Sequence, residues 1–123
     1  MDHPTSAALD ADEALSARSA TAPRVSVDDL RNGVVEGYYV NAGSVVSRSH
    51  GGDLPEDHPL RLMTLCFLIC DNGFVIVGKS APASAENFDV EKGRVFAYED
   101  AMRQLWPMRG FALRQRLHEA DAR

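Results

Sequence analysis

The sequence predicts a small α+β domain built from an N-terminal helix, a two-stranded antiparallel β-hairpin, a long helix and a C-terminal helix. Three patterns favour this class: a capped helical stretch after Ser26, two apolar runs joined by Asn72-Gly73, and a long helical pattern after the hairpin. The length of 123 residues suits one domain, and 45% hydrophobic with 25% charged residues is an ordinary globular balance.

The N-terminal segment, residues 1–23, is expected to be a disordered tail, followed by a single α+β domain over residues 24–123. The tail is rich in Ala, Ser, Asp and Thr and contains no aromatic or β-branched apolar residue. Such a segment cannot bury enough surface to offset the entropy lost on ordering. Only residues 6–15 have the composition of a transient helix.

The first confident helix is predicted over residues 27–39. Ser26 with Asp29 three residues later resembles a capping box. Apolar residues then recur at helical spacing, namely Val27, Leu30, Val34 and Tyr38. Gly and Pro residues follow, so residues 41–60 are expected to form a flexible loop.

The strongest local signal is the hairpin made by residues 62–70 and 74–81. Asn72-Gly73 between two apolar runs favours a type I′ turn, which would place Ile69 opposite Ile76. One face would then carry Met63, Leu65, Phe67, Ile69, Phe74 and Ile76, and the other Cys66, Leu68, Cys70, Val75 and Val77. Both faces are apolar and both need a cover. Helices can cover one face and a second subunit is the simplest cover for the other, which predicts a dimer or higher oligomer.

The two cysteines, Cys66 and Cys70, lie four residues apart in the first of these strands. At strand rise they are about 13 Å apart, too far for a disulfide within one strand. They are expected to be reduced core residues, which fits a cytosolic compartment.

The long helix is expected to follow Ser84 as its cap and to end at Trp106, because Pro107 cannot continue a helix without losing a hydrogen bond. Asp89 and Glu91 suit the helix N-terminus. A separate last helix is predicted after Gly110.

Several function classes lack support in this sequence. No serine lies in a Gly-x-Ser-x-Gly frame, and the four histidines have no metal-ligand spacing, so we expect neither an enzyme, nor a metal site, nor a cofactor. No run is long enough to span a membrane. The net charge of −5 makes nucleic acid an unlikely partner.

The charge is unevenly distributed along the chain. Residues 1–30 hold two arginines against six acids, a net of −4, whereas residues 94–123 hold six arginines against four acids, a net of +2. These arginines can balance acids of a neighbouring copy, or bind a phosphate as planar bidentate donors. Phe74 and Phe88 can likewise join the hairpin to the helix or stack on a base.

One block of motifs resembles a known family. The motifs, in order, are Leu65–Phe67, Asp71-Asn72-Gly73-Phe74, Gly78-x-Ser80-Ala81, Glu86-Asn87-Phe88-Asp89, Gly93-Arg94, Leu105-Trp106-Pro107, Gly110-Phe111 and Arg116-Leu117. Together with the front helix, they resemble the small bacteriophage protein family named after gene product forty-nine of one coliphage and gene sixty-six of another phage. The resemblance covers about residues 24–117. The chain departs from the family pattern at Lys79, where an acid is usual, and at Pro82, where a cysteine is common.

The chain also resembles, more distantly, the phage Thoeris anti-defence sponge proteins. That resemblance implies a homo-oligomeric, non-enzymatic protein of the host bacterial cytoplasm that sequesters a cyclic nucleotide or ADP-ribose-type signal. The positions here with suitable chemistry for ligand binding are Asn87, Phe88, Arg94, Arg114 and Arg116. The alternatives are a protein–protein inhibitor or adaptor acting on a host factor, with the acidic tail in the contact, and a phage accessory protein of another role.

Overall fold

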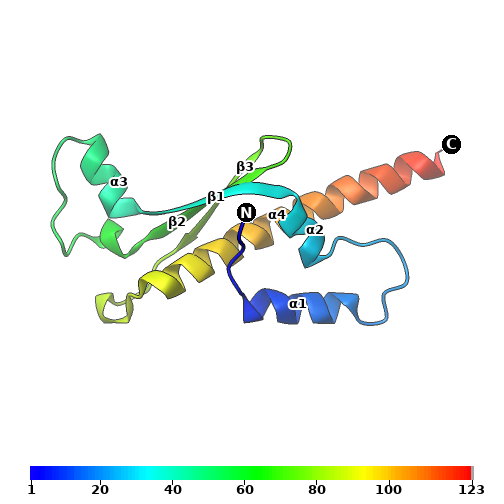
Figure 1. Cartoon of the computed structure of the whole chain (residues 1–123), viewed down its shortest axis with the longest axis horizontal. Helices are drawn as coiled ribbons and strands as arrows, with labels where there is room; N and C mark the ends of the chain where they lie inside the picture. Colours follow the sequence, from blue (N-terminus) through cyan, green and yellow to red (C-terminus); the bar gives the residue numbers. More distant parts are fainter. Residues whose placement is uncertain (123) are drawn as a thin grey trace.

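The computed structural model describes residues 1–122 and contains a three-stranded antiparallel sheet packed against one long helix (Figure 1). The α+β class is therefore confirmed. The elements are α1 (Ala7–Ala17), α2 (Val27–Asn32), β1 (Val34–Asn41), α3 (Ala42–Ser49), η1 (Pro59–Leu62), β2 (Thr64–Cys70), β3 (Val75–Ser80), η2 (Ala85–Asn87) and α4 (Val90–Asp121). The strand order is β1-β2-β3, so β2 is central.

The predicted hairpin is present as β2 and β3, but its register is one residue away from the prediction. Ile69 pairs with Val75 rather than with Ile76. The turn has three residues, closed by the Cys70 N–H, which donates to the Phe74 carbonyl at 2.8 Å. Within this turn only Gly73 has a positive φ, +86°, whereas a type I′ turn needs two such residues. The shift moves Ile76 to the buried face of the sheet and turns Val75 and Val77 outward.

The third strand replaces the second half of the predicted first helix. The capping box of Ser26 and Asp29 is confirmed, but α2 ends at Asn32 and the chain continues as β1 after Gly33. The sequence of β1 is Val-Val-Glu-Gly-Tyr-Tyr-Val-Asn, in which β-branched and aromatic residues favour strand over helix. The free edge of β2 supplies hydrogen-bond partners for it, so the two-stranded prediction and the helix beyond residue 32 are wrong.

The segment predicted as a loop, residues 41–60, contains α3 and leads into η1. Asn41 begins α3, because its side-chain oxygen accepts from the Ser44 N–H at 3.2 Å. The rest of the connection is held by Arg61, whose Nη2 donates to the Leu54 carbonyl at 2.7 Å. The loop prediction is therefore wrong for residues 42–49, which form a helix that the Asn41 side chain caps.

The N-terminal segment, for which the sequence predicts a disordered tail, contains α1 and contacts the rest of the chain. Ser6 caps α1 through the Leu9 N–H at 3.0 Å, and the Ser6 hydroxyl donates to the carboxylate of Glu99. Leu9 is fully buried, and His3 Nδ1 lies 2.7 Å from the Tyr98 hydroxyl. Composition alone does not indicate these contacts, because only a few side chains of the segment enter a core that other elements build.

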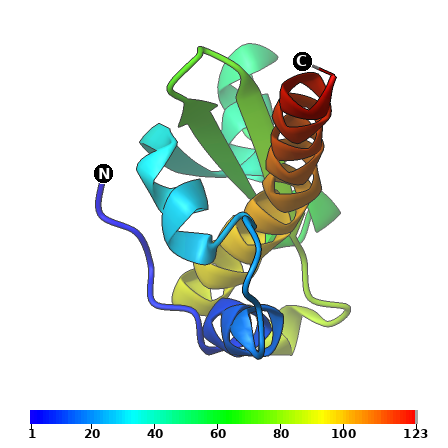
Figure 2. The same ribbon diagram turned by 90° about the vertical axis from the view of Figure 1, so that its right-hand side faces the viewer.

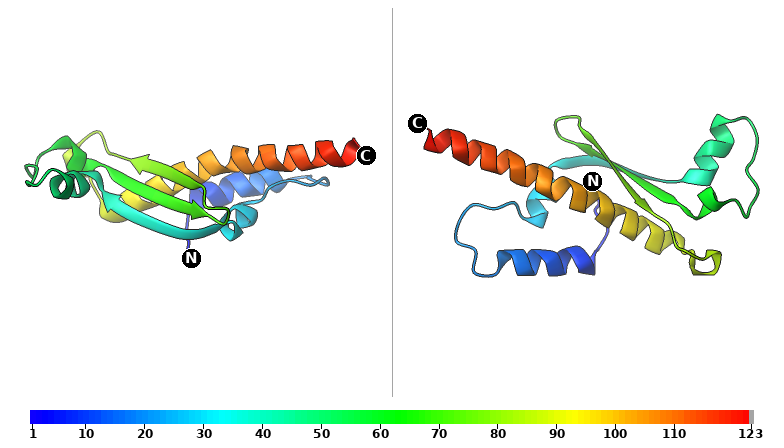
Figure 3. Two further views of the ribbon diagram at one scale, coloured as in Figure 1. Left: turned by 90° about the horizontal axis from the view of Figure 1, so that it is seen from above. Right: turned by 180° about the vertical axis from the view of Figure 1, so that it is seen from behind.

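Helix α4 runs without a break through Pro107, so the predicted end at Trp106 and the separate last helix are wrong. Side-chain contacts hold the helix on both sides of the proline: the Trp106 indole N–H donates to the Val25 carbonyl at 2.9 Å, and Arg109 Nη2 lies 3.0 Å from Asp71 Oδ1. The cap of α4 is Asp89, which accepts from the Lys92 N–H, whereas the Ser84 side chain makes no cap bond. The C-terminal turns of α4 project beyond the sheet (Figure 3).

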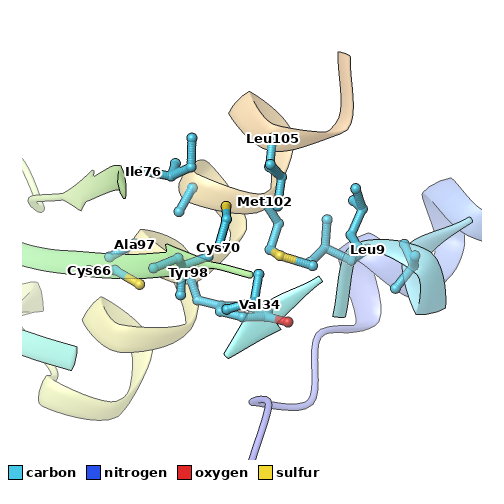
Figure 4. Packing of buried hydrophobic residues seen from close by; sticks show 13 residues of the cluster. Leu9, Val34, Cys66, Cys70, Ile76, Ala97, Tyr98, Met102 and Leu105 are labelled. Atoms are coloured by element: carbon cyan, nitrogen blue, oxygen red, sulfur yellow. The ribbon is translucent and has the colours of Figure 1, made fainter. Parts of the chain in front are cut away.

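The core lies between the sheet and α4, with α2 and α1 completing it. Figure 2 shows α1 on the side of α4 that faces away from the strands, and Figure 4 shows labelled side chains from α1, the three strands and α4 meeting. The fully buried members include Leu9, Leu30, Leu68, Tyr98 and Met102. A small residue sets the helix-to-sheet distance, because a Cβ on Gly78 would lie 2.0 Å from the Ala97 carbonyl oxygen.

Candidate functional site

The five residues predicted to bind a ligand lie in two separate groups. Asn87 and Phe88 precede α4, and Arg94 is near its start, whereas Arg114 and Arg116 are close to its C-terminal end. Twenty residues of helix separate Arg94 from Arg114, which is about 30 Å at helical rise. One copy of the chain does not bring the five side chains together.

Asn87, Phe88 and Arg94 line two small hollows, and Phe88 belongs to both. Asn87 and Phe88 line a hollow of about 160 Å³ beside Ser80 and Lys92. Phe88 also lines a hollow of about 80 Å³ with Arg94 and Tyr39. Phe88 therefore lies between Asn87 and Arg94, although each hollow is small for a nucleotide.

A larger hollow lies at the other end, between α2, the β2–β3 turn and α4. Its volume is about 360 Å³, and three arginines line it, so we call it the arginine hollow. Its lining residues are Arg24, Val25, Asp29, Asn32, Gly33, Asp71, Arg109, Leu113 and Arg116. Of the predicted site residues only Arg116 belongs to it, because Arg114 is not among the lining residues.

Two of the three arginines are already held by carboxylates. Arg24 Nη1 lies 2.5 Å from Glu13 Oε1, and Arg109 Nη2 lies 3.0 Å from Asp71 Oδ1. Among residues 1–122, Arg116 makes no ion pair. The arginine hollow thus has one guanidinium group free to meet an anion and two more that are fixed in place.

The carboxylates that line the arginine hollow leave it with a small positive balance. Three arginines face Asp29 and Asp71. The backbone N–H of Ser26 holds the pKa of Asp29 below its usual value, so Asp29 is ionised and committed to the helix cap. Both lining carboxylates are engaged, Asp29 by the helix cap and Asp71 by Arg109, and the guanidinium groups can bind an anion.

Sequence reasoning missed Arg24 and Arg109 for identifiable reasons. A helix predicted to continue to Tyr39 separates Arg24 and Gly33 from the hairpin turn, and a helix predicted to stop at Trp106 leaves Arg109 without a position. The Asp71–Arg109 pair joins residues 38 apart in the chain, and no local pattern indicates it.

Other polar groups serve the core. His3, Tyr98 and Arg31 form one cluster, in which burial lowers the pKa of His3 and the His3 Nε2 lies 3.1 Å from the Arg31 carbonyl. Cys66 and Cys70 are free and buried, and burial raises the pKa of Cys66 to about 11. In residues 1–122 no three His, Cys, Asp or Glu side chains are grouped so as to hold a metal ion. None of the helices in that range combines the length and apolarity needed to cross a bilayer.

Comparison with known proteins gives one match. The model of a family described as "Phage protein (N4 Gp49/phage Sf6 gene 66) family" matches residues 25–117. This stretch contains the whole sheet, Arg109 and Arg116, and it begins one residue after Arg24 and well after α1. No curated protein and no solved structure matches the chain.

Proposed function

The chain belongs to the phage protein family of N4 Gp49 and phage Sf6 gene 66, and from that premise we propose that it is a non-enzymatic binding protein that holds a small phosphorylated ligand in the arginine hollow. In a host bacterial cytoplasm, such a protein acts in counter-defence by sequestering a cyclic nucleotide or ADP-ribose-type signal. The observation that supports this proposal most directly is the convergence on one hollow of Arg24, which precedes α2, with Arg109 and Arg116, both of α4.

The chemistry of the arginine hollow fits a phosphate better than a neutral ligand. Guanidinium groups are planar, always charged and donate in pairs to phosphate oxygens. The volume of about 360 Å³ is at the lower end of small-molecule sites. The Asn32 side chain adds an amide at the wall that could hydrogen-bond a base or a ribose.

A matched pair of variants on one helix tests the proposal. Purified protein is titrated calorimetrically with cyclic ADP-ribose, a cyclic dinucleotide and, as a control, inorganic phosphate. Arg116→Gln should weaken binding about tenfold, because it removes a charge-assisted contact worth about 1.5–3 kcal/mol. Arg114→Gln, two residues away and outside the lining, should leave binding unchanged.

Two results would count against this assignment. Absence of binding by all the probes at micromolar protein removes the ligand proposal. Loss of binding in Arg94→Gln, with Arg116→Gln unaffected, moves the ligand to the hollows beside Phe88.

A second candidate is a protein–protein inhibitor or adaptor that acts on a host factor. The observation that favours it is the exposed apolar surface on the projecting part of α4, where Phe111 is 73% exposed and Met108 is 44% exposed. The acidic N-terminal residues are less available for a host contact than the sequence suggests, since Asp12 and Glu13 pair with Arg103 and Arg24. Capture of a stoichiometric host protein by the wild type, lost in Phe111→Glu, would favour this candidate.

A further inference from the structure

The face of the sheet that points away from α4, here called the outer face, is apolar and uncovered. Burial along β2 alternates residue by residue, with Cys66 and Leu68 buried towards α4 and the intervening side chains half-buried on the other side. By register the outer face comprises Tyr38, Leu65, Phe67, Ile69, Val75 and Val77. Tyr38 is 55% exposed, and Val75 and Val77 are 48% and 45% exposed. Figure 3 shows α4 on the opposite side of the strands.

The edges of the sheet favour contact through the face rather than through strand addition. At the free edge of β3, the Lys79 N–H donates to Asp100 Oδ2 at 2.9 Å, and Gln104 Nε2 donates to the Val77 carbonyl at 2.9 Å. These α4 side chains occupy the groups that an added strand would use. The opposite edge strand, β1, is interrupted by a bulge between Val34 and Glu36, which also disfavours pairing.

Charge placement on the outer face is self-complementary. The three strands contain one acid, Glu36, and one base, Lys79, and both are exposed. Glu36 stands at the level of Ile69 on one edge strand, and Lys79 stands at the level of Leu65 on the other. They occupy opposite corners, separated by about 13 Å along the strands and about 10 Å across them.

A two-fold axis within the plane of the outer face, perpendicular to the line that joins these corners, exchanges them. In a pair of sheets related by that axis, each Glu36 faces the Lys79 of the other copy, and the apolar residues between them meet. The strands then cross at about 70°, which approaches the orthogonal class of sheet packing. Self-complementarity of this kind is what an isologous interface requires.

We propose that a second copy of this chain covers the outer face, in a two-fold dimer with Glu36 of each copy paired to Lys79 of the other. The interface is independent of the arginine hollow, which lies between α2, the β2–β3 turn and α4 and shares no lining residue with the outer face. Ligand binding can therefore fail while the dimer stands, and the dimer can fail while ligand binding stands.

A charge-exchange cycle tests the arrangement. Sedimentation velocity and light scattering over low to high micromolar protein should show a wild-type dimer. Glu36→Lys and Lys79→Glu should each raise the dimer dissociation constant about tenfold or more, because each places two pairs of like charges in contact. The double variant Glu36→Lys with Lys79→Glu should return the constant close to that of the wild type.

Two further variants test whether the dimer forms through the outer face and not through α4. Val77→Asp should dissociate the dimer and keep the circular dichroism spectrum and cooperative melting of the wild type. Phe111→Lys, an exposed apolar residue on α4, should leave the dimer intact. A wild type that stays monomeric throughout, a dimer that is lost in Phe111→Lys but not in Val77→Asp, or a double variant no better than the singles would each overturn the proposal.

Discussion

The two faces of the sheet share one central strand and are both apolar, yet only one of them takes a helix. On the inner face, Cys66 is flanked by Tyr39 and Gly78, and Leu68 is flanked by Gly37 and Ile76. On the outer face, the positions that flank Phe67 are Tyr38 and Val77. Apolarity therefore does not choose the face to which α4 binds. Gly78 distinguishes the inner face, because the absence of a Cβ there lets the backbone of α4 approach the backbone of β3.

The largest effect is expected from closing that approach. A Cβ at Gly78 would lie 2.0 Å from the Ala97 carbonyl oxygen and 2.7 Å from the Ala101 nitrogen, both backbone atoms that cannot rotate away. Gly78→Ala should lower the free energy of unfolding by about 3 kcal/mol or more, measured by urea denaturation. Gly110→Ala, in α4 with open space around it, is the control and should raise the free energy of unfolding by about 0.5–1 kcal/mol. Equal losses in both variants would show that helix backbone, not the contact with the sheet, limits stability.

The second effect concerns the far side of α4, where α1 extends the inner layer. Leu9 is fully buried there, so Leu9→Ala should cost about 2–3 kcal/mol of unfolding free energy. Leu15, on the same helix and 68% exposed, is the matched control, and Leu15→Ala should cost less than about 0.5 kcal/mol. A loss below 1 kcal/mol for Leu9→Ala would restore the disordered tail that composition suggests.

A third test compares neighbouring residues of β3 on opposite faces. Ile76 is 4% exposed and Val77 is 45% exposed. At protein concentrations low enough to keep the chain monomeric, Ile76→Ala should cost about 2–3 kcal/mol of unfolding free energy and Val77→Ala below about 1 kcal/mol. The ranking decides the register, because the type I′ turn would have placed Ile76 on the face with Phe67 and Val77 on the face with Leu68. A larger loss in Val77→Ala would therefore support the two-residue turn.

Sequence patterns predicted the parts of this fold that depend on local chemistry. The capping box at Ser26 and the β2–β3 hairpin rest on contacts between residues close in the chain, whereas the predicted cap at Ser84 was wrong and Asp89 takes that place. Predictions failed where distant partners decided the outcome. Residues 34–41 have apolar residues at helical spacing but the composition of a strand. They form a strand because the open edge of β2 offers hydrogen-bond partners.

The candidate site shows the same division between contacts that are local in sequence and contacts between distant residues. Asn87, Phe88 and Arg94 are close in sequence and line two hollows that have Phe88 in common. The arginine hollow depends on α4 continuing through Pro107, which brings Arg109 to Asp71 and Gly33. Because a proline inside a helix is unfavourable unless tertiary contacts compensate, no local rule predicted that arrangement.

The smallest expected effect is a pH dependence of the free energy of unfolding that originates at His3. Burial lowers the pKa of His3, whose neutral ring donates from Nε2 to the Arg31 carbonyl and accepts at Nδ1 from the Tyr98 hydroxyl. The unfolded chain therefore binds a proton at His3 more readily than the folded chain does. The stability from this site is complete above the unfolded value of 6.5 and declines as the pH falls below it. Urea midpoints at pH values above and below this window should differ more for the wild type than for His3→Gln, which keeps a polar side chain but cannot titrate. An equal change of the urea midpoint with pH in the two proteins would mean that the His3 ring is not held against Tyr98. Only the contacts of Ser6 and Leu9 would then hold the N-terminal segment.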